Sequence, residues 1–190
     1  MQSKTASVLR TKSLPVDPLI RVYDEFIEGG TLRRDLSRAH DSLRPHTKLG
    51  AAVWTVDMPG CQDAPTAIRR FARLVLACVG SEGIRAVEYW TNTIHAGSGI
   101  PSHIDKDEWL YRQTRTVVSP VTIAVYYADQ CRFEGGELEV ARVRIAACPN
   151  RLIIFAGHLE HQVHNVDAGI RRSLVVNAWR SPPSPPPGSN

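Results

Sequence analysis

Thr122-Ile123-Ala124-Val125-Tyr126-Tyr127 is an apolar stretch, rich in β-branched and aromatic residues, of the kind that forms buried strands. Similar short runs recur after Ile84, and turn residues such as Gly97-Ser98-Gly99 and Pro149-Asn150 separate them. Many short strands at short intervals predict a β-sandwich or a barrel. The expected strands are Ala86–Thr91, Val121–Tyr127, Glu137–Val140, Arg142–Ala146, Leu152–Phe155, Gln162–Val166 and Ser173–Trp179.

Before Ile84 the pattern is helical. Apolar residues follow helical spacing in several stretches, and Gly29-Gly30 and Gly80 are helix-stop signals. The sequence therefore predicts an α+β chain, mainly β, with helices over 18–80 and strands mostly over 84–180. The expected elements of the first part are helices over Leu19–Ile27, from Thr31 to about Leu43, and from Asp63 or Thr66 through Cys78, with a strand over Ala51–Val56.

Length and composition indicate one domain. The chain has 190 residues, of which 43% are hydrophobic, enough for a single core over 18–180. Residues 1–17 are expected to be flexible, and the Pro-rich end, 181–190, is expected to be a disordered tail. The sequence does not indicate an oligomeric state.

The charge is mildly basic and scattered. The net charge is +4, and the absence of any long run of like charges argues against nucleic acid and favours small anionic molecules. No apolar run is long enough to cross a membrane, and the first residues do not form a secretory signal. The four cysteines are widely spaced, without a CxxC pair, so we expect reduced thiols and a cytoplasmic protein.

His103-Ile104-Asp105 is the first candidate for chemistry. In an extended segment, residues two apart point to the same face, so an imidazole and a carboxylate can share one metal ion. Two histidines and one carboxylate form the facial triad of non-haem Fe(II) oxygenases, which leaves coordination positions open. The second histidine could be His158, His161 or His164. These three could also form a zinc site of their own, but their spacing suits a helix, whereas the nearby valines and glycines indicate a strand.

From about Val87 to Trp179 the chain resembles the prolyl-4-hydroxylase-like branch of the Fe(II)/2-oxoglutarate-dependent dioxygenases. The resemblance implies a double-stranded β-helix, or jelly roll, with helices packed against one sheet. It rests on the order of several motifs: His103-Ile104-Asp105, Thr122–Tyr127, Phe133-Glu134-Gly135-Gly136-Glu137-Leu138, Pro149–Phe155, His161-Gln162-Val163, and Gly169-Ile170-Arg171-Arg172-Ser173-Leu174.

The same resemblance implies roles for individual residues. The family spacing from ligand histidine to arginine selects His161, so that Fe(II) would be held by His103, Asp105 and His161. Arg171, two residues before a serine, would anchor 2-oxoglutarate, while Arg172 would face the other side of the strand. Tyr127 would offer its hydroxyl to the distal carboxylate of 2-oxoglutarate, with a buried core aromatic as the alternative.

The function implied is oxidation of an unactivated C–H bond with O2. Hydroxylation is the default and desaturation or cyclisation remain open; family halogenases replace the carboxylate ligand, and Asp105 is present. The expected substrate is a small molecule, such as an amino acid or a biosynthetic intermediate. The alternatives are a protein side chain as substrate, a non-catalytic jelly-roll binding module, and a zinc or iron enzyme that does not use 2-oxoglutarate.

Several other residues are weaker candidates. The loop Asp107–Val118 is either a lid over the metal or an ordinary charged loop, and its arginines would suit a carboxylate substrate. Trp54 and Trp90 either line the pocket or pack in the core. His46 and His95 belong to no motif. The candidates in the loop are Trp109, Tyr111, Arg112 and Arg115.

Overall fold

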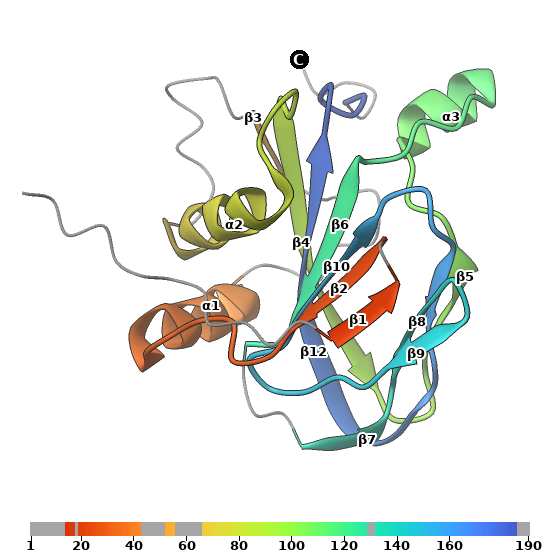
Figure 1. Ribbon diagram of the computed structural model, residues 1–190. Coiled ribbons are helices and arrows are strands. Elements are labelled where there is room, and N and C mark those ends of the chain that lie inside the picture. Colours follow the sequence, from red (N-terminus) through yellow and green to blue (C-terminus); the bar gives the residue numbers. More distant parts are fainter. Residues whose placement is uncertain (1–13, 18, 43–51, 56–65, 129–131, 186–190) are drawn as a thin grey trace, which may run out of the picture.

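The computed structural model describes residues 14–17, 19–42, 52–55, 66–128 and 132–185. Within these residues two antiparallel sheets pack face to face, and two helices cover the outer face of the larger sheet (Figure 1). The strand order of the larger sheet is β1-β2-β10-β6-β12-β4-β3, with β7 paired to β12, and that of the smaller sheet is β5-β11-β8-β9. This is the jelly roll that was expected.

The strands of the larger sheet are β1 (Leu14–Asp17), β2 (Ile20–Tyr23), β3 (Ala52–Thr55), β4 (Ala86–His95), β6 (Thr122–Tyr126), β7 (Phe133–Gly135), β10 (Leu152–Ala156) and β12 (Val166–Trp179). Those of the smaller sheet are β5 (Ile100–His103), β8 (Leu138–Val140), β9 (Val143–Ile145) and β11 (His161–Val163). The helices are α1 (Gly30–Ser42), α2 (Thr66–Val79) and α3 (Glu108–Thr114).

Strand alternation divides the core into two clusters. Successive side chains of a strand point to opposite faces, so Tyr126 of β6 packs against Phe71 of α2 in the cluster beneath the helices. Its neighbour Val125 points the other way, into the cluster between the sheets, where Leu138 and Val140 of β8 face it. The functional cavity lies on this second side.

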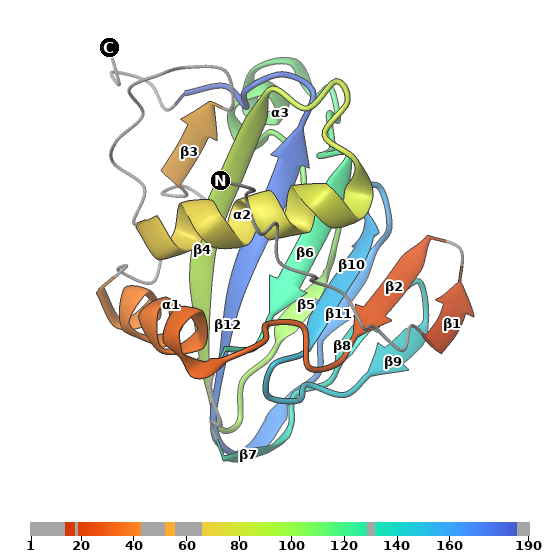
Figure 2. The ribbon, with the colours of Figure 1, turned by 60° about the vertical axis from the view of Figure 1, so that its left-hand side comes forward.

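Helix α2 forms as its sequence predicts. Ile68, Phe71 and Val75 are buried against the larger sheet, which α2 crosses over β4, β12 and β6 (Figure 2). The helix ends where Gly80 adopts φ 84° and donates its N–H to the carbonyl oxygen of Leu76. This glycine conformation closes the last turn at no steric cost. Helix α1 also lies where it was predicted.

The predicted helix over Leu19–Ile27 is wrong. Ile20–Tyr23 form β2 instead, paired antiparallel with β10. Ile20 and Val22 are buried between the sheets, while Arg21 between them donates to the carbonyl oxygen of Cys78 on the helical side. The apolar positions of this segment fit the periodicity of a helix as well as that of a strand, and hydrogen bonding to β10 selects the strand. The structure also gives Leu14–Asp17 as β1, within the stretch expected to be flexible; residues 1–13 are outside the described part.

The loop expected over Asp107–Val118 contains α3. Asp107 caps this helix, because its Oδ1 accepts the N–H of Leu110 at 2.9 Å, and Glu108 adds a negative charge to the first turn. Strands β4 and β12 are longer than predicted, since their antiparallel pairing continues from Leu174 and Thr91 as far as Ile170 and His95.

None of the described helices has the length and apolar character needed to span a bilayer. Cys78 and Cys148 are free thiols, while Cys61 and Cys131 lie outside the described residues.

Candidate metal and cosubstrate site

Strand pairing brings the predicted triad together. His103 at the end of β5 and His161 at the start of β11 are directly opposite each other in the smaller sheet. Asp105 follows β5, and its Oδ1 lies 3.5 Å from Nε2 of His103 and 3.9 Å from Nε2 of His161. One ligand atom from each residue lies within 4.8 Å of the others.

Both imidazoles are oriented by backbone carbonyls. Nδ1 of His103 lies 2.7 Å from the carbonyl oxygen of Pro101, and Nδ1 of His161 lies 3.0 Å from that of Leu159. A carbonyl accepts only, so each Nδ1 donates, which in the neutral imidazole leaves the lone pair on Nε2. Such a bond on the far nitrogen is the usual support of a metal-ligating histidine. Two imidazole nitrogens and one carboxylate oxygen fit Fe(II), which was the ion expected.

Asp105 is buried and held on its second oxygen. Its Oδ2 accepts a hydrogen bond of 3.0 Å from Nδ2 of Asn177, which comes from β12. Glu88 of β4 lies close to this pair and takes a hydrogen bond of 3.1 Å from Nε1 of Trp179. Burial, with the nearby charge of Asp105 as a second cause, raises the pKa of Glu88 to about 7.

Arg171 is a fully buried cation in the same cavity. It donates from Nε to the carbonyl oxygen of Gly136 at 2.9 Å and from its other nitrogens to Ser173 and Tyr127. Among the described residues it forms no ion pair with a carboxylate. A buried guanidinium without an anion is costly, so the site fits an anionic ligand at this end.

Gly136 makes room for this arginine. A Cβ on Gly136 would lie 3.0 Å from Cδ of Arg171, and the residue has φ 67°. The turn Glu134-Gly135-Gly136-Glu137 therefore needs glycine both for its positive φ, as predicted, and for close contact with the arginine.

Tyr127 is buried beside Arg171. Its hydroxyl accepts a 2.6 Å hydrogen bond from Nη2 of Arg171, and the guanidinium carbon lies 5.0 Å from its ring centre. Burial raises the pKa of the Tyr127 hydroxyl. Tyr126 faces the helical side and donates to Oδ1 of Asn150, so alternation separates the two tyrosines.

A cavity of about 230 Å³ joins the triad to Arg171. It lies between the two sheets, and most of its walls are apolar. Trp90 and Asn92 of β4 belong to its lining, so Trp90 is a pocket residue; the side chain of Trp54 is outside the described part. The remaining lining residues are Ile100, His103, Asp105, Ile123, Val125, Leu138, His161, Val163, Arg171, Ser173 and Val175.

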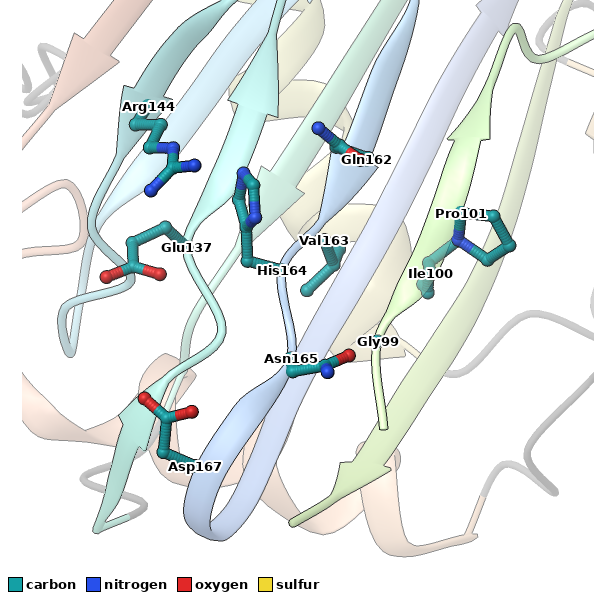
Figure 3. Close-up of a pocket in the computed structure, with 10 residues that line it drawn as sticks. All are labelled: Gly99, Ile100, Pro101, Glu137, Arg144, Gln162, Val163, His164, Asn165 and Asp167. Atoms are coloured by element: carbon teal, nitrogen blue, oxygen red, sulfur yellow. The ribbon is translucent and has the colours of Figure 1, made fainter. Parts of the chain in front are cut away.

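The competing histidines do not join the triad. Nε2 of His164 lies 2.9 Å from a carboxylate oxygen of Glu139. Together with Gln162 and Arg144, His164 borders a separate open hollow of about 560 Å³ on the outer face of the smaller sheet (Figure 3). His158 is exposed in the turn before β11, and His95 is exposed at the end of β4. The alternative zinc site is therefore not formed in the described chain, and His46 lies outside it.

The residues of α3 do not line the cavity. The Arg112 guanidinium stacks over Trp109 and that of Arg115 over Tyr111, with the guanidinium carbons 5.1 and 5.6 Å from the ring centres. The two arginines are thus held on aromatic faces of their own segment. Arg172 points to the helical side and contacts His40.

Three further residues that were not predicted from the sequence contact the site: Asn177, Ser173 and Glu88. A signal for the first two was available. Both lie an even number of residues after Arg171, so on one strand they share its face, and Asn177 is a polar interruption of the apolar run Leu174–Trp179. Glu88 has no such signal, because its neighbours are set only by the pairing of β4 with β12.

The sequence matches no protein-family model and no curated protein. Solved structures do match. A Pseudomonas putida prolyl-4-hydroxylase gives a TM-score of 0.60 at 19% identity, over 86% of this chain and 94% of that one. A Burkholderia pseudomallei oxidoreductase of the 2OG-Fe(II) oxygenase family gives a TM-score of 0.59 at 16% identity, over 90% of this chain and 89% of that one.

A third match is a prolyl hydroxylase of Trichoplax adhaerens, solved with a peptide fragment of hypoxia inducible factor. It gives a TM-score of 0.53 at 14% identity, over 85% of this chain and 84% of that one. At such identities the likeness concerns the fold. The chain therefore has the jelly-roll fold of prolyl-4-hydroxylases and other 2OG-Fe(II) oxygenases, with a His-Asp-His group suited to a metal ion.

Proposed function

We propose that this protein is an Fe(II)- and 2-oxoglutarate-dependent oxygenase that oxidises a C–H bond, by hydroxylation as the default outcome. One observation carries the proposal: His103, Asp105 and His161 share a single cavity with the buried cation Arg171. A triad alone would suit many metal enzymes. A buried guanidinium facing the same space adds a partner for a carboxylate-bearing cosubstrate.

The residues divide the work between the two ends of the cavity. His103, Asp105 and His161 would hold Fe(II), while Arg171 would bind the distal carboxylate of 2-oxoglutarate, with Tyr127 orienting the guanidinium. The mostly apolar walls would limit water in the space between them once the ligands are bound. When bound, Fe(II) with 2-oxoglutarate and O2 supplies the oxidation: 2-oxoglutarate becomes succinate and CO2, and one oxygen atom enters the substrate C–H bond.

We propose a small molecule as the substrate. The cavity of about 230 Å³ must also hold the cosubstrate, so only a small group reaches the triad. Trp90 would contact that group, because it is the aromatic lining residue contributed by β4.

A protein side chain is the second candidate. Exposed apolar residues occur in the segments next to the site: Ile104 between two of the ligands, and Val117, Val118 and Val121 after α3. They would suit a polypeptide surface. The likeness in fold to prolyl hydroxylases, one of them solved with a peptide, supports the same candidate.

Anaerobic titration tests the cosubstrate. Addition of 2-oxoglutarate to the Fe(II) protein should produce a visible metal-to-ligand charge-transfer band, and absence of the band would contradict the proposal. Succinate release with O2 should then be followed over two panels, free amino acids and related small metabolites in one and peptides in the other. Stimulation by the first panel supports a small substrate, stimulation by the second a protein substrate. The band without succinate release under any condition would identify a binding module.

A further inference from the structure

The two oxygens of Asp105 have different surroundings. Oδ1 faces Nε2 of both His103 and His161, and Oδ2 accepts the hydrogen bond from Nδ2 of Asn177. The bond joins two buried side chains that lie 72 residues apart in sequence. Asp105 lies after β5 rather than within a strand, so its orientation depends on such side-chain contacts.

The position of Asn177 follows from the larger sheet. It lies on β12, six residues after Arg171, and therefore on the same inward face of the strand. Antiparallel pairing sets it opposite Glu88 of β4. The Asn177 amide therefore lies beside two carboxyl groups, and hydrogen bonding by Asn177 partly offsets the rise that burial causes in the pKa of Glu88.

This arrangement fixes which way the amide points. A carboxylate accepts only, and a primary amide has two N–H groups on one side and an acceptor on the other. Turning the Asn177 amide over would place its oxygen against both Asp105 and Glu88. The buried Oδ1 of Asn177 has no partner among the described residues. The Asn177 amide is therefore oriented by its donation to the carboxyl groups, and this orientation leaves its own Oδ1 without a donor.

We infer that Asn177 is a positioning residue of the metal site, whose amide turns Asp105 so that Oδ1 is presented to the ion and Oδ2 is retained by the protein. The inference rests on the proposed function. In this arrangement the inward face of β12 carries both Arg171, which would anchor the cosubstrate, and Asn177, which supports the carboxylate ligand Asp105. Partners of this kind in the outer shell typically contribute about 10- to 100-fold to metal affinity.

Anaerobic Fe(II) binding against a competing chelator tests the inference. Asn177→Leu should weaken Fe(II) binding about 10- to 100-fold, because Leu has a similar size and no donor. Asn177→Ala should also weaken it, by about tenfold, and avoids overfilling the site. Melting of the metal-free variants shows whether they are folded under the assay conditions. A merely structural role would lower the melting temperature and leave the Fe(II) affinity of the folded protein unaltered, whereas a positioning role lowers that affinity.

Asn92→Leu is the matched control. Asn92 lines the same cavity, and no hydrogen bond from its side chain to the triad is present in the described chain. Its Fe(II) affinity should stay within about threefold of wild type. Wild-type affinity in both Asn177 variants, or equal losses in Asn92→Leu and Asn177→Leu, would overturn the inference alone. Failure of the wild-type protein to bind Fe(II) would overturn the proposed function together with it.

Discussion

Replacing Arg171 by leucine should remove most of the affinity for 2-oxoglutarate and leave Fe(II) binding nearly unchanged. Arg171 is 1% exposed, and its guanidinium is fixed by Gly136, Ser173 and Tyr127. The guanidinium is therefore already oriented and largely desolvated when a carboxylate arrives. The triad does not contact it within the described hydrogen bonds and ion pairs, so the two losses are separable.

The magnitude follows from the burial. Truncating one partner of a buried, hydrogen-bonded charge pair costs about 2–5 kcal/mol, much of it from the partner left unpaired. At about 1.4 kcal/mol per tenfold, this corresponds to a loss in affinity of roughly 30-fold to several thousandfold. The affinity of Arg171→Lys for 2-oxoglutarate should lie between those of the wild type and Arg171→Leu, because an ammonium keeps the charge but cannot form the two-pronged contact.

The stability of the ligand-free protein should change much less than the affinity. Leucine removes a buried cation that forms no ion pair in the described chain, which is favourable, but it leaves the Gly136 carbonyl and the Tyr127 hydroxyl without a donor, which is not. The two effects oppose each other. Thermal melting would show whether the variant is folded under the conditions of the binding assay.

The assay is anaerobic titration of 2-oxoglutarate into the Fe(II) protein, followed by the charge-transfer band. Arg172→Leu is the matched control, because Arg172 is the adjacent residue on the same strand and points to the helices, where it contacts His40. It should change the affinity by less than about threefold. Equal losses in the two variants, or a larger loss in Arg172→Leu, would refute the assignment of the anchor.

Three further predictions concern neighbouring groups. His161→Ala should abolish Fe(II) binding, whereas His164→Ala, which removes a contact on the outer face, should keep it; the opposite result, in the same chelator assay, would reject His161 as a ligand. Tyr127→Phe should weaken 2-oxoglutarate binding about 3- to 10-fold, since one hydrogen bond that orients Arg171 is lost; an unchanged titration would argue against that role. The raised pKa of Glu88, about 7 against an ordinary 4.5, means that the folded metal-free protein retains a proton which the unfolded chain releases. Its contribution is fully present below about pH 4.5 and is lost as the pH rises through about 7. The unfolding free energy of the wild type should therefore fall between about pH 5 and pH 8, and in Glu88→Gln this fall should be smaller by at most about 3 kcal/mol, as measured by urea titrations. An equal fall in the wild type and the variant would contradict the raised pKa of Glu88.

Local patterns were sufficient for much of the fold. The continuous apolar runs of β6 and β10 predict strands with two buried faces, and the structure shows both faces covered, one by helices and one by the smaller sheet. Helix α2 was predictable because its apolar stripe and the stop at Gly80 are contained within a few turns of chain. Alternation also separates Arg171 from Arg172 and Tyr127 from Tyr126, since parity within one strand needs no knowledge of its neighbours.

The errors occur where a local pattern permits two structures. The apolar positions of Leu19–Ile27 fit a helix as well as a strand, and only the open edge of β10 selects the strand. The helix α3 depends on the cap from Asp107, within a segment whose composition is that of a loop. For β2 the deciding hydrogen bonds become visible only in three dimensions, whereas the cap of α3 is local, since it joins residues three apart.

The sequence by itself determined the chemistry available to this protein: the His-x-Asp pair, a second histidine that the family resemblance selects as His161, and two adjacent arginines that alternation sends to opposite faces. The tertiary structure decided which groups act together. Pairing of β5 with β11 sets His103 opposite His161, pairing of β12 with β4 brings Asn177 to Glu88, and the packing of the two sheets brings Asn177 to Asp105. Contacts between residues distant in the chain depend on strand register and sheet packing, which no local spacing contains.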